Sequence, residues 1–178
     1  MNVLGISCHY HDSAACLITD GLIKAAGAEE RFTRKKHDNG FPFKTIDYCL
    51  KEFGKSINEL DAVVFYEKPI IKFERTIHQH LQNFPKSLSS ALDSIPQWFN
   101  QKLRIEKILR EELNYHGKIY YSSHHLSHAA SAYYLSGFKK AAILTIDGVG
   151  EWATTTMGIG KNKDIQIDQE ISFPHSLG

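Results

Sequence analysis

Two stretches of this chain share one pattern, and this repeat constrains the fold more than any other feature. Each stretch begins with a short apolar segment that ends in a polar residue, and continues through a turn of small residues into a second apolar segment. The first copy is 3–7 followed by 13–19, and the second is 143–147 followed by 153–159. Short apolar segments bounded by turn residues are typical of β-strands. Both copies therefore predict a β-hairpin.

Further elements are predicted after each hairpin. Asp20-Gly21 is a favoured two-residue hairpin turn, and Gly54 is a favoured residue for ending a helix. The first copy is predicted to continue as a strand at Leu22–Ala28, a charged connection at 29–38, a helix at Phe43–Phe53 and a strand at 62–66 closed by Pro69. The second copy is predicted to continue as a strand at 165–173.

The middle of the chain is predicted to be mostly helical. Residues 70–113 have a helical pattern interrupted by Pro85 and Pro96, which predicts two or three helices inserted over the sheet. A short strand at Lys118–Tyr121 and a helix at 124–135 follow, with Ser122 and Ser123 as candidate N-caps.

A β-β-β-α-β-α order that restarts is the plan of the two-lobed superfamily of actin, sugar kinases and acetate kinase. We therefore expect an α/β, actin-like (ribonuclease-H-like) fold, by analogy at the level of the fold alone. The first lobe is expected at 1–138, with the helical insertion at about 70–113, and the first strands of the second lobe at 139–178. Because the second copy stops early, we expect the front part of a longer protein.

The composition is that of a folding, water-soluble chain, with 42% hydrophobic and 23% charged residues. The net charge of +1 provides no general attraction for nucleic acid or anionic membranes, so neither is an expected partner. No apolar run approaches the roughly 20 residues that span a membrane. Cys8, Cys16 and Cys49 form no CxxC motif, which predicts reduced thiols and a cytoplasmic location.

The strongest candidate for chemistry is the segment His124-His125-Leu126-Ser127-His128. Residues four apart share one face of a helix, so His124 and His128 can reach the same metal ion. Both are predicted to point away from the apolar side of the helix, so packing does not account for them. His125 pairs with His128 at a spacing of three and is a weaker competitor. A pair of surface or hydrogen-bonded histidines is the alternative.

Asp147 ends the predicted strand at 141–146 and is followed by Gly148-Val149-Gly150. Glycines let the backbone approach a ligand closely. The carboxylate of Asp147 could accept a hydrogen bond from a substrate or hold a cation. A plain hairpin turn is the alternative interpretation.

The first hairpin turn contains His9, His11 and Asp12, and the repeat places it opposite Asp147 across an expected cleft. His11 could act as a general base on a hydroxyl within hydrogen-bond reach. A basic segment after the third strand suits phosphate or carboxylate groups. Its members are Arg31, Arg34, Lys35, Lys36 and His37. Solvated side chains are the alternative in both places.

Four stretches, in this order, together resemble the O-carbamoyltransferase family of nodulation-factor and antibiotic biosynthesis. They are LGISCHYHDSAACLI, EERFTRKKHD, HHLSHAASAYYLS and ILTIDGVGEW. Members of that family are much longer. They join an actin-like pair of lobes, related to the tRNA threonylcarbamoyl transferases, to a domain that makes carbamoyl-adenylate from carbamoyl phosphate and ATP.

The resemblance implies roles for individual residues. His124 and His128 match an iron-binding HxxxH motif, with Fe²⁺ or another divalent metal as the cofactor and a further carboxylate ligand beyond Gly178. His11 matches the histidine thought to act as the base on the acceptor.

The resemblance also implies substrate contacts. Lys36 and Asp147 match positions that contact carbamoyl-adenylate or the acceptor. Asp12 and Gly148 are further candidate substrate contacts, and His9 has a weaker role.

The function implied is therefore the N-terminal part of an ATP-dependent O-carbamoyltransferase. It would transfer a carbamoyl group from carbamoyl phosphate, through carbamoyl-adenylate, to a hydroxyl group of a small molecule. Without the adenylate-forming domain, this part of the protein is expected to be inactive. The alternatives are an ATP-dependent kinase of the same fold, in which Asp147 assists phosphoryl transfer, and a non-catalytic metal-binding module.

Overall fold

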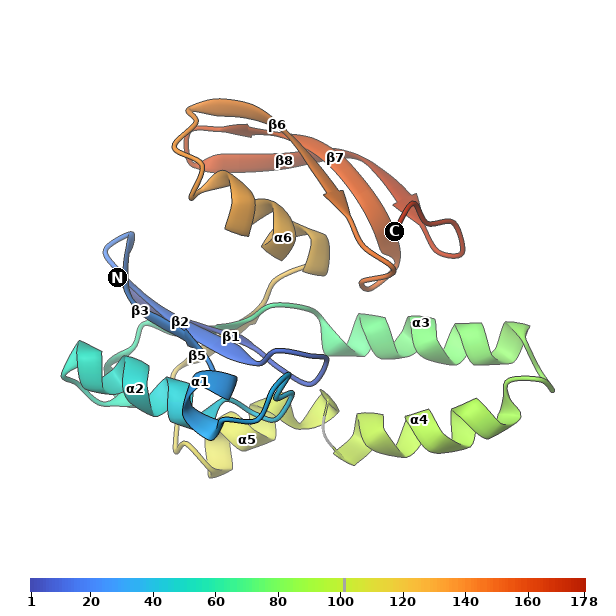
Figure 1. The fold of residues 1–178 in the computed structure, drawn as a ribbon, viewed down its shortest axis with the longest axis horizontal. Helices are drawn as coiled ribbons and strands as arrows, with labels where there is room; N and C mark the ends of the chain where they lie inside the picture. The colour runs from blue at the N-terminus through green and yellow to red at the C-terminus, as the bar shows by residue number, and fades with distance from the viewer. Residues whose placement is uncertain (101) are drawn as a thin grey trace. The chain divides into compact units, whose positions relative to one another are not determined.

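The computed structural model describes residues 1–100 and 102–178, which form two compact units. The first unit comprises 1–66 and 95–121, and the second comprises 67–94 and 122–178. The strands are β1 (Asn2–Ser7), β2 (Ala14–Thr19), β3 (Leu22–Ala28), β4 (Ala62–Phe65), β5 (Lys118–Tyr121), β6 (Lys140–Ile146), β7 (Ala153–Lys161) and β8 (Asp164–Ser172) (Figure 1). The α-helices are α1 (Glu30–Thr33), α2 (Phe43–Phe53), α3 (Pro69–Gln82), α4 (Leu88–Asn100), α5 (Ile105–Glu111) and α6 (His124–Tyr133), with short 3-10 helices at Ile57–Glu59 and Lys102–Arg104.

The first unit contains a five-stranded sheet in the order β3-β2-β1-β4-β5. β2 is antiparallel to both β1 and β3, whereas β4 is parallel to β1 and β5 is parallel to β4. α2 packs against β2 and β3 (Figure 1). Side chains of the sheet form one hydrophobic core with side chains of α2 and α5. Its most deeply buried members include Leu4, Leu17, Ile46, Val63, Phe65, Ile105 and Leu109.

The second unit contains a three-stranded antiparallel sheet in the order β6-β7-β8. α6 lies against one face of this sheet (Figure 1) and buries Ala129 and Tyr133 against Ile143. Along β6, the residues whose side chains are buried alternate with residues whose side chains lie on the opposite, exposed face. Leu144 pairs with Met157 across the ladder on that face, and their side chains are 60% and 44% exposed.

The predicted repeat is confirmed at the level of topology. β1-β2-β3 and β6-β7-β8 are both antiparallel meanders, and both begin at the predicted first strand. Leu4 pairs with Leu17 in the first copy as Leu144 pairs with Met157 in the second. Leu4 is completely buried, whereas Leu144 is largely exposed. The two copies therefore share strand order but differ in which faces are covered.

Local sequence signals predicted the ends of several strands and helices correctly. Asp20 and Gly21 have φ values of 50° and 83°, as a tight hairpin turn requires. α2 ends at Gly54, whose φ of 73° is left-handed and whose N–H bonds back to the carbonyl groups of Leu50 and Lys51. The predicted strands at Asn2–Ser7, Leu22–Ala28 and Lys118–Tyr121 have the observed bounds.

Other predictions about the elements were wrong. The charged connection at 29–38 includes the short helix α1, because the Glu29 carbonyl accepts hydrogen bonds from the N–H groups of Phe32 and Thr33. Pro69 begins α3 rather than only closing β4, since a proline in the first turn of a helix loses no internal hydrogen bond. Pro96 lies inside α4 and does not end it. Trp98, two residues later in the same helix, is buried.

The division of the chain into domains at 138/139 remains a prediction. α3 and α6 belong to the same compact unit as the second sheet. All three cysteines are free, and burial raises the pKa of Cys49 to about 11. Within the described residues, every helix is too short or too polar to cross a membrane.

Candidate functional site

His124 and His128 lie on consecutive turns of α6, the helix that covers the second sheet. The helix begins at His124 with Ser123 as its N-cap residue, one of the two predicted candidates, although the Ser123 side chain makes no capping hydrogen bond. The Ser123 carbonyl instead accepts the N–H of Ser127 at 3.0 Å. The Nε2 atoms of His124 and His128 are 3.1 Å apart. The two rings thus converge as the spacing of four predicts.

Asp147 joins the two histidines from the end of β6. Its N–H donates to the Thr154 carbonyl at 2.9 Å, which holds the residue beside β7. Its Oδ2 lies 2.8 Å from His124 Nε2 and 4.0 Å from His128 Nε2. One ligand atom from each of the three residues lies within 4.8 Å of the others. Two imidazole nitrogens and one carboxylate oxygen form a donor set suited to Fe²⁺ or Zn²⁺.

The burial of His124 corrects one sequence prediction. His124 is only 6% exposed, so it does not point away from the packed side of the helix. Its Nδ1 lies 3.3 Å from a carboxylate oxygen of Glu67, which is also buried. The side chain of His128, by contrast, is half exposed. The cluster therefore has a buried side at His124 and an open side at His128.

The surroundings of His128 and Asp147 favour the forms of these two residues that bind metal ions. Burial lowers the pKa of His128, and electrostatic interaction with His124 lowers it further. Burial acts to raise the pKa of Asp147, but His124, the Gly148 N–H and His128 together hold it below its ordinary value. A neutral imidazole and an ionised carboxylate are the forms that bind metal ions.

His125 is removed from the candidate ligands by its own contacts. Its Nδ1 lies 2.6 Å from the Thr145 hydroxyl, and its Nε2 lies 2.9 Å from the Ala153 carbonyl oxygen. Both nitrogens therefore have partners in the second sheet. His125 therefore links α6 to β6 and to the start of β7. His124 and His128 remain as the candidate pair of ligands.

A second cluster lies in the first unit, around Asp12. The Asp12 carboxylate lies 2.7 Å from His11 Nδ1 and 2.8 Å from His37 Nδ1. Asp12 and His37 have φ values of 45° and 55°, and left-handed backbone is uncommon for residues other than glycine. Hydrogen bonds from His37 and then His11 lower the pKa of Asp12. The loop after β1 and the loop after α1 are thus joined through one carboxylate.

The remaining predicted site residues lie beside these two clusters. His9 has a φ of 67°, and its N–H donates to the Asn39 carbonyl at 2.9 Å. The Lys36 side chain is exposed on the loop after α1. The N–H of Gly148 donates to Asp147 Oδ1 at 2.7 Å. His11 belongs to the first unit and Asp147 to the second, so the predicted cleft between them stays a prediction.

Three residues of these clusters were missed as specific candidates by the sequence analysis. Glu67 contacts His124, Lys72 contacts Glu67, and His37, a member of the basic segment, contacts Asp12. Glu67 follows β4 closely, and a polar residue just after a buried strand is the signal that could have found it.

We predict that replacing His37 by glutamine raises the pKa of Asp12. The His37 hydrogen bond is the largest cause of the lowered pKa, and it favours the ionised form. The stabilisation that this bond gives is present above the ordinary aspartate pKa, and is lost as the pH falls through the lowered value. A carbon-13 NMR titration of the Asp12 carboxyl group checks the shift. An unchanged midpoint would contradict the assigned contact.

We predict that Gly150→Ala weakens metal binding without removing a ligand. A Cβ atom at Gly150 would lie 2.7 Å from His124 Cδ2, so the ring has to move. A Cβ atom at Gly148 would meet no atom within 4 Å, which makes Gly148→Ala the matched control. Calorimetric titration with a divalent metal should show weaker binding in the first variant only. Equal losses in both variants would contradict this steric argument.

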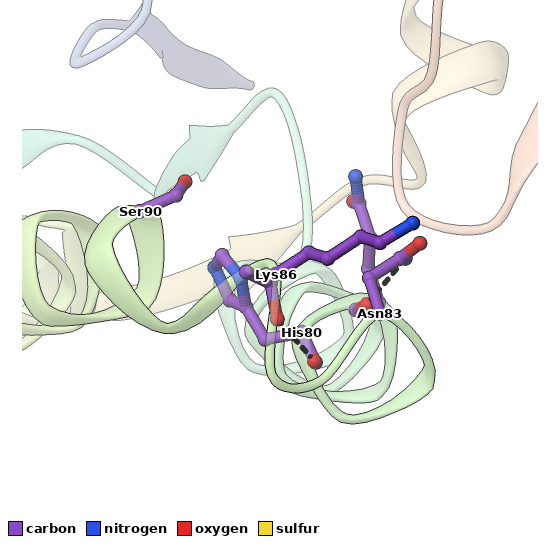
Figure 2. Close-up of a pocket in the computed structure, with 6 residues that line it drawn as sticks. His80, Asn83, Lys86 and Ser90 are labelled. Carbon is purple, nitrogen blue, oxygen red and sulfur yellow. Dashed lines mark hydrogen bonds between the residues drawn. The ribbon is translucent and has the colours of Figure 1, made fainter.

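Two hollows lie elsewhere in the second unit. One, of about 220 Å³, is lined by residues that include His125, Leu126, Glu151 and Trp152. The other, of about 290 Å³, lies between α3 and the start of α4, where His80, Asn83, Lys86 and Ser90 surround it (Figure 2). His124, His128 and Asp147 do not line either hollow.

The sequence matches a family model over nearly its whole length. The model is described as the carbamoyltransferase N-terminus, and it matches residues 2–178.

Curated relatives agree with this match. A protein of Synechocystis sp. that is named as uncharacterized is 47% identical over 99% of this chain, and the match covers 30% of the relative. The nodulation protein NolNO of Sinorhizobium fredii is 35% identical over 94% of this chain, which corresponds to 24% of that protein. The chain thus spans less than a third of the length of these relatives.

A solved structure supports the fold. A Pseudomonas aeruginosa protein described as similar to the peptidase YeaZ superposes with a TM-score of 0.50 at 13% identity, over 97% of this chain and 66% of the other. At that identity the likeness concerns the fold alone. The predicted α/β, actin-like fold class is confirmed.

Proposed function

Since this chain belongs to the carbamoyltransferase family by its match to the N-terminal model, we propose that it provides the metal centre and the acceptor base of an O-carbamoyltransferase. The observation that carries the proposal is the convergence of His124, His128 and Asp147, whose ligand atoms lie within 4.8 Å of one another. Neither a plain hairpin turn at Asp147 nor a surface pair of histidines requires these three groups to meet.

The donor set fits a divalent cation. Fe²⁺ is the proposed cofactor, held by His124, His128 and Asp147, with a further carboxylate ligand from beyond residue 178. A bound divalent cation supplies Lewis acidity, which stabilises negative charge that develops on a carbamoyl oxygen. The pKa values of His128 and Asp147 are both lowered, so protons compete weakly with the cation.

His11 is the proposed base for the acceptor hydroxyl. Its Nδ1 lies 2.7 Å from the Asp12 carboxylate, which can accept the Nδ1 proton. That hydrogen bond leaves the lone pair on Nε2, the nitrogen that is free to take a proton. Asp12 is held in turn by His37 at 2.8 Å. The second cluster therefore holds the His11 ring in the form that a general base needs.

The proposed co-substrates are ATP and carbamoyl phosphate, which yield carbamoyl-adenylate in another part of the protein. Lys36 is exposed on the loop after α1 and is proposed to bind the adenylate phosphate. His9 and Gly148, at the turns of the two repeats, are proposed substrate contacts, and Gly148 offers close backbone approach.

In the proposed transfer step, each bond that forms is matched by one that breaks, and the acceptor proton has a base to receive it. The acceptor oxygen forms a bond to the carbamoyl carbon, the bond from that carbon to the adenylate oxygen breaks, and AMP leaves. The acceptor proton passes to His11 Nε2. The acceptor is proposed to be a small molecule with a hydroxyl group.

A cytoplasmic location is proposed for the protein, and its three free cysteines are consistent with that location.

The test is to supply the intact protein with carbamoyl phosphate and radiolabelled ATP. We expect pyrophosphate release that depends on carbamoyl phosphate, and AMP once a hydroxyl acceptor is added. Formation of ADP would contradict the proposal in favour of a kinase. An absence of turnover with every acceptor would contradict it in favour of a non-catalytic metal-binding module.

A further inference from the structure

We infer that Glu67, held in place by Lys72, is a positioning residue that orients His124 for metal binding. The inference rests on the proposed metal centre and adds two residues that the sequence did not single out for it. Both come from the segment between β4 and the first turn of α3, and both belong to the same compact unit as α6.

The contacts form a chain that leads to the metal ligands. Lys72 Nζ donates to Glu67 Oε2 at 2.6 Å, and the two side chains are only 8% and 5% exposed. The same Oε2 lies 3.3 Å from Nδ1 of His124. On the other side of the ring, Nε2 of His124 faces the other two proposed ligands, Asp147 and His128.

This arrangement gives each nitrogen of the His124 ring a separate task. An imidazole that binds a metal through Nε2 carries its proton on Nδ1, and a carboxylate that accepts this proton fixes both the tautomer and the plane of the ring. Glu67 stands at Nδ1, on the side of the ring opposite Asp147. It therefore favours the orientation in which the Nε2 lone pair points at the cluster.

The pair of Glu67 and Lys72 is poorly explained by stability alone. Buried ion pairs pay a large desolvation cost, and replacing both members with apolar groups of similar size is often neutral or stabilising. Here the carboxylate has a second partner, and that partner is a proposed metal ligand. Lys72 neutralises the buried carboxylate and holds it at a fixed position under the ring. The pair thus acts as a support for His124.

The experiment measures metal affinity in the full chain by calorimetric titration with Zn²⁺ and Co²⁺. Glu67→Gln keeps the shape of the side chain but removes its charge, and should weaken binding about 10- to 100-fold. Glu74 is an exposed carboxylate on α3, so Glu74→Gln is the matched control and should bind like the wild type. The absorption spectrum of bound Co²⁺ should also change in Glu67→Gln, because the ring has lost its fixed orientation.

A second variant distinguishes a loss of metal affinity from a loss of folding. Glu67→Gln alone leaves Lys72 buried without its carboxylate, whereas the double variant Glu67→Gln/Lys72→Met removes both charges and keeps similar volumes. The double variant should melt near the wild-type temperature without metal and still bind metal at least about tenfold more weakly. Wild-type affinity and an unchanged Co²⁺ spectrum in the folded double variant would overturn the inference alone. A wild-type protein that binds neither metal would overturn the metal centre, and this inference with it.

Discussion

Replacing His124 by alanine should abolish metal binding and carbamoyl transfer while carbamoyl-adenylate formation continues. His124 is the member of the cluster whose Nε2 lies near both of the other proposed ligands, at 2.8 Å from Asp147 and 3.1 Å from His128. Loss of a residue that only supports a ligand typically costs 10- to 100-fold in metal affinity. Loss of the ligand itself is therefore expected to cost more than about 100-fold. Metal content, pyrophosphate release and carbamoylated product, measured on the intact protein, separate these steps.

His116 provides the control for this substitution. It is exposed, and its Nε2 lies 2.9 Å from the Asn114 side chain in the first unit. His116→Ala should keep wild-type metal content and product formation. A His124→Ala protein that retained its metal and its transfer activity would refute the proposed metal centre.

Replacing Leu4 by alanine should destabilise the first unit by about 2–5 kcal/mol. Leu4 is completely buried in the middle of β1 and is paired with Leu17 on β2 and Val63 on β4, which are also completely buried. Close packing on both sides prevents the cavity from collapsing, so the loss includes a cavity term. Urea unfolding followed by circular dichroism gives the free energy of unfolding.

Leu144 is the matched control, because it holds the corresponding place in the second meander but is 60% exposed. Leu144→Ala should change the free energy of unfolding by no more than about 0.5 kcal/mol. Equal losses in the two variants would show that Leu144 is covered in solution.

Much of the fold was predictable because its elements carry local signals. Apolar runs and the Asp20-Gly21 turn indicated the meander of the first unit, and Gly54 marked the end of α2. The same pattern at 143–147 indicated the repeat. Local patterns failed where tertiary packing decided the outcome. Pro96 remained inside a helix beside the buried Trp98, and α6 ended at Tyr133 rather than at residue 135.

The candidate site was predictable only in part, for the same reason. The spacing of His124 and His128 is local, so their convergence followed from helix geometry. Asp147 was found as a polar residue at a strand end, but its meeting with the histidines depends on how β6 lies against α6. Glu67 and Lys72 come from a segment far from α6 in the sequence. The contacts of Lys72 with Glu67 and of Glu67 with His124 are products of tertiary folding, and no local pattern encodes them.

The uncovered face of the second sheet has a consequence for work with this polypeptide. Leu144, Ile146, Met157 and Ile159 form a continuous apolar surface on β6 and β7, and within the described residues β6 pairs with β7 alone. An exposed apolar face next to an unpaired strand edge is the combination that natural proteins protect against aggregation. Concentrated samples are therefore expected to self-associate through this sheet. Dilute solutions and mild detergent are expected to limit this self-association.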